Sequence, residues 1–429
     1  MRAMKDSGVP WIGEIPEGWE VCRIKDVAML YNGNSIKDEE KDNYTNPENT
    51  YPYISTKDID ATYLSINYTN GLYTSKDDST FKIAQKDSCL MCIEGGSAGK
   101  KKAYVEQDVS FVNKLCCFAP HKMDGKYLFY YLCSPTFESE FYKYISGLIG
   151  GVSVSTLKNF IQLLPPLAEQ QKIAEFLDRK CAEVDKMIAL QEQIIEELKA
   201  YKQSVITEAV TKGLNPSAPM RDSGIEWIRE IPEHWEVKRL KNIFRLKTGT
   251  TPNGFDIVNE DSEIIPWFTP SDISDDCCEL HQSERKLYKS EVGEIELFPK
   301  GSLMFVGIGA SAGKLGYSHI SGYSNQQITA LIPDNCNGKY YYYFLIADRK
   351  RLRDNAFFTT LPIINNGYLS QNKVVYPPTT EQQAIADYLD EKCADIDSLI
   401  QTKQSKIDSL KEYKKSIIYE YVTGKREVE

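Results

Sequence analysis

A tandem duplication constrains this 429-residue chain more than any other feature of its sequence. Residues 6–27 match residues 222–243 at fourteen of twenty-two positions, and both copies contain Trp-Ile-x-Glu-Ile-Pro-Glu-x-Trp-Glu-Val. A second match joins Pro-Pro-Leu-Ala-Glu-Gln-Gln at 165–171 to Pro-Pro-Thr-Thr-Glu-Gln-Gln at 377–383. The segments between these blocks differ in composition and by four residues in length. The chain therefore contains two copies of one scaffold whose middles have diverged.

Composition limits the classes of protein that fit. A chain of this length with 41% hydrophobic residues can form several ordinary cores. No apolar run approaches the roughly 18 residues that a membrane span requires, and the N-terminus has no signal-peptide core. The eleven cysteines are an odd number and favour reduced, buried thiols. We therefore expect a soluble, cytoplasmic protein.

The charge balance argues against a free-standing basic nucleic-acid binder. The formal net charge is −10, and residues 1–165 and 222–378 each carry three more acidic than basic side chains. If the chain holds DNA, local patches and a partner must therefore supply the cations that neutralise phosphates.

Two segments are predicted to be mixed globular domains. Residues 1–166 and 222–378 contain short alternating runs rich in Tyr, Val, Ile, Thr, Gly and Pro, which indicate short strands, turns and a few helices. The aromatic runs 127–132 and 340–345 occupy equivalent places in the two copies. Each run predicts a buried helix, although an aromatic strand fits nearly as well.

Residues 167–213 and 379–425 are predicted to be long helices, with residues 214–221 as a linker after the first. Their apolar residues follow the four-three spacing of a coiled-coil seam, which is interrupted by polar residues such as Gln191 and Lys403. Those two are either solvated breaks or residues that fix the register. A helix of about 43 residues would measure about 65 Å and needs a long partner, so we expect the two helices to pack antiparallel. The predicted seam residues are Leu177, Val184, Ile188, Ile195, Leu198, Leu389, Ile396, Ile400, Ile407 and Leu410.

The chain resembles the specificity subunit of type I restriction-modification systems in three features. These are the Trp-Ile-x-Glu-Ile-Pro-x-x-Trp opening, the Pro-Pro-x-x-Glu-Gln-Gln helix start and the repeat of domain and helix. The similarity covers essentially the whole chain. It implies an α+β fold with two target recognition domains of short strands and helices in pseudo-twofold tandem repeat. In that family the two domains are separated by two long antiparallel coiled-coil helices.

The resemblance also implies a function. Each domain would read one half of a bipartite asymmetric site in double-stranded DNA, and the helices would set the spacer and dock two methyltransferase subunits. Restriction and translocase subunits would attach further out. The chain itself would hold no cofactor, and S-adenosylmethionine would be bound by the methyltransferase subunits.

Catalysis by this chain alone is not expected. Its Pro-Pro doublets follow Leu164 and Tyr376 rather than the Asp or Asn of adenine methyltransferases, and no P-loop is present. Cys89-Leu-Met-Cys92 fits a buried strand better than a zinc site, and the four histidines fit ordinary surface positions, so we expect no metal. The alternatives are a coiled-coil adaptor that holds two protein-binding domains without a DNA role, and a solitary nuclease.

Candidate DNA-binding residues lie in the diverged middles. Each copy has Gly-x-Ser-Ala-Gly-Lys after a hydrophobic strand, which can press amides and a cation against a phosphate but also fits a plain hairpin turn. Lys114 aligns with Gln326, and Lys pairs with guanine whereas Gln pairs with adenine, as unequal half-sites require. A turn capped by Asn explains the neighbouring asparagines equally well. The candidates are Lys57, Ser97, Lys100, Lys101, Lys102, Asn113, Lys114, Ser153, Ser155, Lys158, Ser271, Ser311, Lys314, Asn325, Gln326, Gln327, Arg351, Asn365, Asn366 and Tyr368.

Residues that are identical in both copies are poor candidates for reading different sequences. The four repeated tryptophans, Trp11, Trp19, Trp227 and Trp235, are therefore expected to pack in the core or to contact a shared methyltransferase. The aspartate that follows Lys57 and Ser271 in the two copies is expected to cap a turn.

Overall fold

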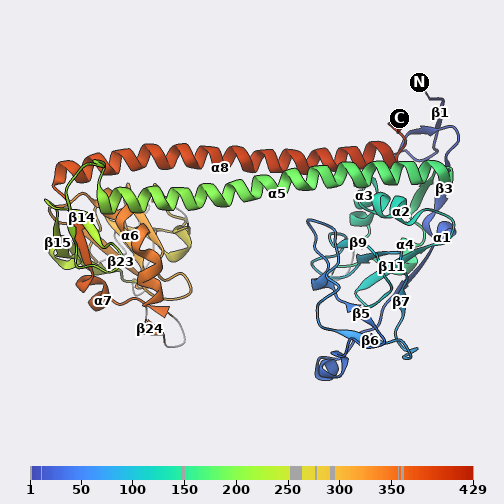
Figure 1. Ribbon diagram of the computed structural model, residues 1–429, viewed down its shortest axis with the longest axis horizontal. Coiled ribbons are helices and arrows are strands. Elements are labelled where there is room, and N and C mark those ends of the chain that lie inside the picture. The colour runs from blue at the N-terminus through green and yellow to red at the C-terminus, as the bar shows by residue number, and fades with distance from the viewer. Residues whose placement is uncertain are drawn as a thin grey trace. The chain divides into compact units, whose positions relative to one another are not determined.

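The computed structural model divides the chain into two compact units, each described here by itself (Figure 1). Unit 1 comprises Met1–Gln193 and Lys403–Glu429, and unit 2 comprises Ile194–Thr402. Each unit contains one mixed domain and one end of both α5 (Leu167–Lys212) and α8 (Thr379–Val422). No helix among the described residues combines the length and apolar character that crossing a bilayer requires. The residues described are 2–10, 12–145, 150–251, 263–275, 278–289, 295–355, 357–358 and 362–428.

The domain of unit 1 is built on two four-stranded sheets with the orders β6-β5-β10-β7 and β4-β11-β8-β9. In the second sheet, β11 pairs antiparallel with both β4 and β8. In sequence order the elements are β1 (Met4–Asp6), β2 (Glu14–Pro16), β3 (Glu20–Arg23), α1 (Ile24–Val27), β4 (Ala28–Asn32), η1 (Asp38–Tyr44), β5 (Thr50–Ile54), η2 (Thr56–Asp58), β6 (Tyr73–Ser75), β7 (Ile83–Ala84), β8 (Cys89–Cys92), β9 (Lys102–Tyr104), β10 (Val109–Phe111), β11 (Leu115–Pro120), α2 (Gly125–Leu132), α3 (Pro135–Lys143), α4 (Val154–Leu157) and β12 (Ile161–Leu164).

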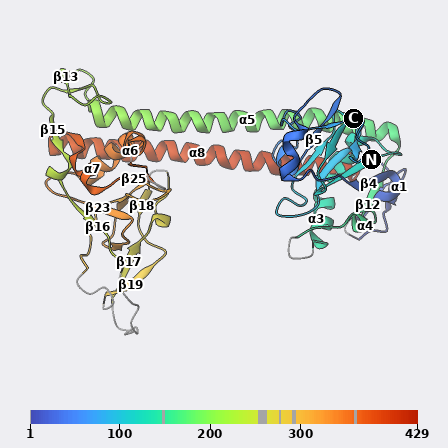
Figure 2. The same ribbon diagram turned by 90° about the horizontal axis from the view of Figure 1, so that it is seen from below.

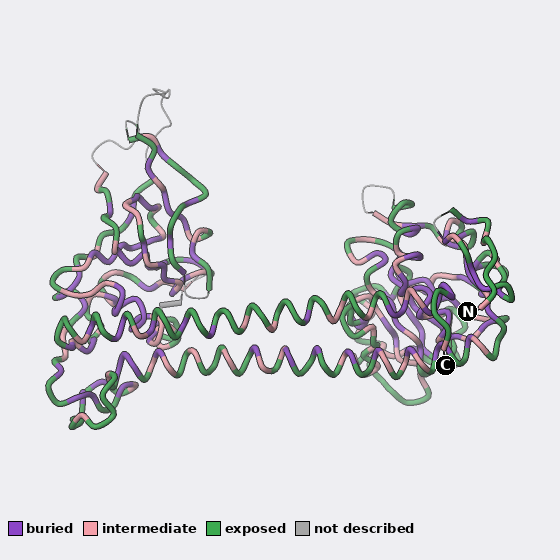
Figure 3. The backbone as a smooth tube through the Cα atoms, turned by 90° about the horizontal axis from the view of Figure 1, so that it is seen from above, coloured by how far each residue is buried: buried purple, intermediate pink, exposed green. Residues whose placement is uncertain are grey.

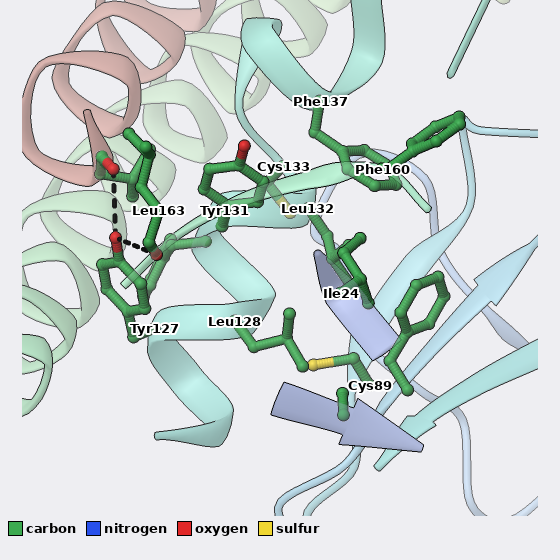
Figure 4. Packing of buried hydrophobic residues seen from close by; sticks show 14 of the residues in the cluster. Ile24, Cys89, Tyr127, Leu128, Tyr131, Leu132, Cys133, Phe137, Phe160 and Leu163 are labelled. Atoms are coloured by element: carbon green, nitrogen blue, oxygen red, sulfur yellow. Dashed lines mark hydrogen bonds between the residues drawn. The ribbon is translucent and has the colours of Figure 1, made fainter. Parts of the chain in front are cut away.

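Alternate residues of β8 face two different cores. Cys89 lies in the core that the sheet shares with Tyr127 and Leu128 of α2, as Figure 4 shows. Cys92 lies in the second core, between the two sheets. All four residues of β8 are buried, so the prediction that the Cys-Leu-Met-Cys run is a buried strand is confirmed. The aromatic run that begins at Tyr127 forms α2, which settles the choice between helix and strand in favour of the helix.

Unit 2 repeats this plan and adds a strand. Its five-stranded sheet, β16-β23-β20-β21-β18, corresponds to β4-β11-β8-β9 with β18 added at the edge, and a three-stranded sheet has the order β19-β17-β22. Figure 2 labels β16, β18 and β23 of the first sheet and β17 and β19 of the second. The elements are β13 (Met220–Asp222), β14 (Glu230–Pro232), β15 (Glu236–Arg239), η3 (Leu240–Asn242), β16 (Phe244–Thr248), β17 (Ile264–Phe268), η4 (Pro270–Asp272), β18 (Cys278–Leu280), β19 (Lys286–Tyr288), β20 (Leu303–Val306), β21 (Leu315–Ser318), β22 (Tyr323–Ser324), β23 (Ile328–Pro333), α6 (Gly338–Asp354), β24 (Phe357–Phe358), β25 (Pro362–Ile363), α7 (Asn366–Gln371) and β26 (Lys373–Tyr376).

The repeated tryptophans anchor the start of each long helix. The indole nitrogen of Trp19 donates to a carboxylate oxygen of Glu169 at 3.1 Å, and Trp235 donates to Glu381 at 2.9 Å. Both tryptophans are buried, at 0% and 1% exposure, so the core-packing interpretation is supported for them. Trp227 is half-buried, and Trp11 lies outside the described residues. The first residue of Glu-Gln-Gln therefore joins the helix to the N-terminal arm of its own copy.

The middle residue of Glu-Gln-Gln is a second anchor. The amide of Gln170 accepts from the backbone N–H of Asp124 and donates to the carbonyl of Pro165, both at 2.8 Å. In unit 2, Gln382 bridges the N–H of Asn337 and the carbonyl of Pro377 at the same distances. Both glutamines are buried, so each bond stabilises the helix start without competition from water.

Each unit also holds the end of the other copy's helix. The hydroxyl of Tyr127 donates to the carbonyl of Val422 at 3.1 Å in unit 1 (Figure 4), and Tyr340 donates to Val210 at 2.8 Å in unit 2. Gly424, just beyond α8, has a φ of +69°, and a Cβ there would lie 2.4 Å from an atom of Pro16. Glycine is therefore required by both the backbone and the packing.

Within each unit the two helix segments pack antiparallel. In unit 1, Asp185 pairs with Lys414 at 2.7 Å, and in unit 2, Lys202 pairs with Asp397 at the same distance. These ion pairs are equivalent, because the two lysines and the two aspartates each lie 212 residues apart, the offset between the two helices. The prediction of an α+β tandem repeat with two long antiparallel helices is confirmed.

Burial follows the predicted seam along both helices (Figure 3). Leu198, Ile400 and Leu410 are half-buried, and the other predicted seam residues are buried. Gln191 is 8% exposed, and its side-chain oxygen has no hydrogen-bond partner in the part of the chain that the structure describes. Lys403 is half-buried. Gln191 is therefore not the solvated break that was one of the two interpretations.

Trp19→Ala is expected to lower the free energy of unfolding by about 3–5 kcal/mol, because it opens a cavity at a fully buried site and removes the donor to Glu169. Urea unfolding of the purified chain measures the change. Met29→Ala is the matched control, since Met29 is in the same unit and 66% exposed, and its effect should stay within about 0.5 kcal/mol. Equal small losses in the two variants would contradict the anchoring role of Trp19.

Candidate nucleic-acid interface

A turn with the same hydrogen bonds follows β8 and β20. We call residues 95–100 and 309–314 the glycine turns. The N–H of Gly99 donates to the carbonyl of Cys92 at 2.8 Å, and Gly313 donates to Val306 at the same distance. The first and the fifth residue of each turn are glycines with positive φ, which other residues rarely adopt. The shape of the backbone thus explains the repeated glycines. It does not fix the contacts of the serine between them or of the lysine after them, which can differ between the two turns.

In unit 1 the glycine turn meets two further segments at one edge of the sheet. Because β8 and β11 are antiparallel, the end of β8 lies beside the start of β11, and the N–H of Ile93 donates to the carbonyl of Lys114 at 3.1 Å. The loop before α4 joins them, since the N–H of Gly95 donates to the carbonyl of Gly150 at 2.8 Å. We call residues 94–100, 112–114 and 150–158 together the first edge.

Unit 2 builds the same arrangement from its own three segments. The N–H of Gly307 donates to the carbonyl of Gln327 at 2.8 Å, and the N–H of Ile364 donates to the carbonyl of Gly307 at 2.8 Å. We call residues 308–314, 325–327 and 362–371 together the second edge. The three sets of candidates that sequence reasoning drew from separate segments are thus neighbours in each domain.

The first edge carries most of the exposed cations among the candidates. Its exposed candidate side chains are Lys100, Asn113, Lys114, Ser153, Ser155 and Lys158, and Ser97 is half-buried. The ammonium of Lys101 donates to the carbonyl of Thr56 at 2.7 Å, which ties the glycine turn to the turn that carries exposed Lys57.

Two of the positively charged candidates, Lys102 and Arg351, bind groups within the protein instead. The side chain of Lys102 is 3% exposed, and its ammonium donates to the carbonyl of Leu132 at 2.8 Å and to Glu138 at 2.6 Å. Arg351 forms a bidentate pair with the buried carboxylate of Asp348 at 2.6 Å. A lysine or arginine held in this way is not available to a phosphate, so neither residue belongs to the surface proposed below.

The cation of the second edge is partly neutralised. The ammonium of Lys314 lies 3.2 Å from Asp275, and the Arg349 guanidinium binds the same carboxylate at 2.6 Å. Hydrogen bonds from Arg349 and Lys314 hold the pKa of the Asp275 carboxyl below its usual value. The exposed candidates Gln326 and Asn365 are neutral, so the second edge offers mainly neutral hydrogen-bonding groups.

Several polar candidates cap turns or helices. The side chain of Asn325 accepts from the N–H of Gln327 at 3.1 Å and donates to its side chain at 3.0 Å. Ser153 accepts from the N–H of Thr156, and Asn365 accepts from the N–H of Tyr368. The capping explanation therefore describes these three residues. The side-chain amides of Asn325 and Asn365 keep part of their hydrogen-bonding capacity, whereas the hydroxyl of Ser153 also bonds those of Ser155 at 2.7 Å and Thr156 at 2.9 Å and has none left.

The remaining candidates have mixed environments. The hydroxyl of half-buried Ser311 and the side chain of half-buried Tyr368 lie on the second edge, and Ser271 is exposed on η4. The carboxylate of Asp272 accepts from the N–H of Thr269 at 2.7 Å, and Asp58 does the same for Ser55 at 2.8 Å. The prediction that these shared aspartates cap turns is confirmed.

Sequence reasoning missed two polar residues at the edges, Asn32 and Thr248. Asn32 ends β4 and donates to the carbonyl of Asn113 at 3.0 Å, whereas Thr248 ends β16 and accepts from Asn366 at 2.7 Å. A signal for them exists in the sequence, because each precedes a glycine at equivalent positions. A Cβ on Gly33 would lie 1.8 Å from the backbone oxygen of Phe111, so this glycine marks a close approach of two segments of the chain.

Comparisons with known proteins agree with the duplicated plan. The family model described as the type I restriction modification DNA specificity domain matches residues 16–200 and 232–422. The specificity subunit of the type I restriction enzyme MjaVIII from Methanocaldococcus jannaschii is 27% identical, with 96% of this chain and 93% of that protein covered. The EcoKI specificity subunit from Escherichia coli is 25% identical, with 90% and 84% covered.

Solved structures share the fold. A chain from a structural study of complex assembly and conformational transition in the type I R-M system gives a TM-score of 0.75 at 17% identity, and 96% of this chain and 99% of that chain are covered. The HsdS subunit from Thermoanaerobacter tengcongensis gives a TM-score of 0.52 at 17% identity, with 96% and 98% covered. At these identities the likeness establishes the fold alone.

Proposed function

Because the chain belongs to the type I restriction modification DNA specificity family, we propose that it is the sequence-reading subunit of such a complex and that each domain reads one half of a bipartite, asymmetric DNA site. The observation that carries this proposal is the pair of edges. Their three segments have the same backbone hydrogen bonds in both domains, while the side chains that they expose differ. The same backbone arrangement with two different sets of exposed side chains suits two domains that bind the same kind of ligand, DNA, at two different base sequences.

The chemistry of the exposed side chains indicates which of them would contact phosphates and which would contact bases. Lys100 and Lys158 on the first edge would contact phosphates, which position the protein without reading sequence. Exposed Lys114 on the first edge and exposed Gln326 on the second edge would reach base edges, since Lys pairs with guanine and Gln with adenine in the major groove. In unit 2 the backbone position of Lys114 is taken by Gln327, because Gly307 donates to Gln327 as Ile93 donates to Lys114. The sequence alignment of Lys114 with Gln326 is therefore shifted by one residue. Because the second edge is nearly neutral, we expect a larger share of its phosphate contacts to come from the partner subunits.

The long helices are proposed to dock two methyltransferase subunits. Large apolar side chains stand exposed at equivalent places on both helices. Met187 and Tyr413 are 42% and 54% exposed in unit 1, and Leu399 and Tyr201 are 50% and 60% exposed in unit 2. Each unit thus offers the same pair of apolar positions, as expected if two copies of one partner bind.

We propose that the methyltransferase subunits, and not this chain, catalyse the methylation of DNA. S-adenosylmethionine would be bound by the methyltransferase subunits, which would modify one adenine in each half-site after taking it out of the helix. Restriction and translocase subunits would join the same assembly. The role of this chain would be to choose the site and to hold the partners on it.

A DNA footprint of the chain reconstituted with its methyltransferase subunits tests the proposal. We expect two protected blocks of fixed sequence separated by a spacer of fixed length and free sequence. A coiled-coil adaptor without a DNA role would protect no sequence in the same assay. Cleavage of DNA by the purified chain with a divalent metal would instead support the solitary nuclease.

Lys114→Gln is expected to change the base preferred at one position of one half-site, away from guanine and toward adenine. The loss of a good base contact is worth about 1–3 kcal/mol of discrimination. Selection of bound sequences from randomised DNA, with the reconstituted complex, measures the preference. Lys122→Gln is the matched control, because Lys122 is exposed in the same domain but outside the first edge. Unchanged preferences, or changes in both half-sites, would contradict the assignment of Lys114.

A further inference from the structure

A cluster of metal-ligating side chains lies outside both edges, at the added edge strand of unit 2. β18 runs parallel to β21, and their register places Glu279 opposite Tyr317 and Leu280 opposite Ser318. His281 and His319 are the next residues along the two strands, and the N–H of His319 donates to the carbonyl of Leu280 at 3.0 Å. Because side chains alternate along a strand, Glu279 and His281 lie on one face, with His319 beside them.

The ligand atoms of these three residues converge. One carboxylate oxygen of Glu279, Oε2, lies 2.7 Å from Nε2 of His319 and 3.9 Å from Nε2 of His281. The two imidazole rings are stacked, with centroids 4.3 Å apart and planes inclined by 8°. One ligand atom from each residue lies within 4.8 Å of the other two, and all three residues are exposed to solvent.

The other oxygen of Glu279 is already held by a buried cation. The ammonium of Lys339 pairs with Oε1, lies 3.2 Å from Asp390, and sits 4.8 Å from the centre of the Tyr317 ring. The Lys339 side chain is 11% exposed, so this contact fixes the direction of the carboxylate. Metal-binding carboxylates are commonly oriented by a hydrogen bond of this kind, which here directs the second oxygen, Oε2, toward the imidazoles.

We propose that Glu279, His281 and His319 form a binding site for a divalent transition-metal ion, with Zn²⁺ as the ion that suits them best. Two imidazole nitrogens and one carboxylate oxygen are a known ligand set for zinc that keeps a further position for water. Magnesium and calcium prefer sites made of oxygens alone and are disfavoured. Around a tetrahedral ion with bonds of about 2.0–2.1 Å the ligand atoms stand about 3.4 Å apart. Binding would require the two imidazoles, which are exposed and now stacked, to turn so that their nitrogens reach that spacing.

The site belongs to the second domain alone, and its consequence is local. In the first domain the corresponding sheet ends at β9, and no strand of that sheet among the described residues corresponds to β18. A bound ion would join residues on the two strands and hold the edge strand β18 on its neighbour. Because an ion that binds only the folded state stabilises it by linkage, Zn²⁺ should raise the melting temperature of the chain.

Metal titration of the full-length chain, purified without a histidine tag and kept reduced, tests the proposal. With Zn²⁺ in a calorimeter we expect one equivalent to bind, and His281→Ala and His319→Ala should each weaken binding at least about tenfold. His121→Ala is the matched control, since His121 is exposed in unit 1 and should leave the affinity unchanged. Melting curves without metal show whether the variants remain folded.

Cobalt identifies the ligands directly. With Co²⁺ as the probe, visible bands of a four- or five-coordinate ion should appear in the wild type and in His121→Ala, without the near-ultraviolet absorption of cobalt thiolates. Thiolate absorption would place the ion on cysteines and overturn the proposal. Equal metal affinity in the wild type and in both cluster variants would also overturn the proposal. The absence of stoichiometric binding would do the same, and the cluster would then be a hydrogen-bonded Glu–His pair that binds no ion.

Discussion

Replacing residues 20–164 with the matching segment of another specificity subunit is expected to change one half of the recognised DNA sequence and to leave the other half unaltered. The replaced segment contains the whole first edge, whereas Trp19, Glu169 and both long helices are retained. The donor must supply a tyrosine at the place of Tyr127, because its hydroxyl holds the end of α8. This is the largest effect that we predict, since every base contact of one half-site changes.

Mapping of modified bases in DNA from cells that carry the exchanged chain and its methyltransferase subunits measures this result. The reciprocal exchange of residues 236–376 is the control and should alter the opposite half-site. A change in both halves after a single exchange would contradict the assignment of one domain to one half-site.

Inserting one heptad into both long helices is expected to lengthen the unspecified spacer by about three base pairs. Seven residues add about 10.5 Å to a helix, and one base pair of DNA rises about 3.4 Å. The insertions belong after Gln193 in α5 and after Thr402 in α8, where the two units divide. At those places both ion pairs, Asp185 with Lys414 and Lys202 with Asp397, keep their registers.

The spacer is read by the same mapping of modified bases. An insertion in α5 alone is the control, because it forces the helices out of register in one unit and should break one ion pair and expose seam residues. We expect that variant to unfold at a lower temperature and to lose activity rather than to gain spacer. An unchanged spacer after the paired insertion, or an altered half-site, would contradict the role of the helices as a ruler.

The sequence predicted the scaffold well because its signals are local and repeated. The four-three spacing of apolar residues indicated both long helices, and the same spacing at an offset of 212 residues indicated that they would pair. What the Glu-Gln-Gln motif does was not predictable. Glu169 contacts Trp19 from 150 positions away, and Gln170 bridges two backbone groups that only the folded chain brings together.

The sequence indicated which segments form the candidate site, but not which of their side chains are exposed in it. Sequence reasoning selected the three loops that form each edge, the glycine turn because it recurs within the diverged middles and the other two because they differ between the copies. It could not separate Lys100, which is exposed, from Lys102, which is buried against Glu138, since the two are neighbours in one basic run. The histidine cluster was missed because His281 and His319 meet only through the parallel register of β18 and β21.

The two domains of this chain are proposed to read two different DNA sequences at a fixed separation. Sequencing of modified bases across the genome of a host that carries the unaltered chain with its methyltransferase subunits tests this proposal most directly. We expect a single asymmetric motif in two parts, with a spacer of constant length and one modified adenine in each part. A continuous motif, a palindrome or the absence of any motif that depends on this chain would contradict it.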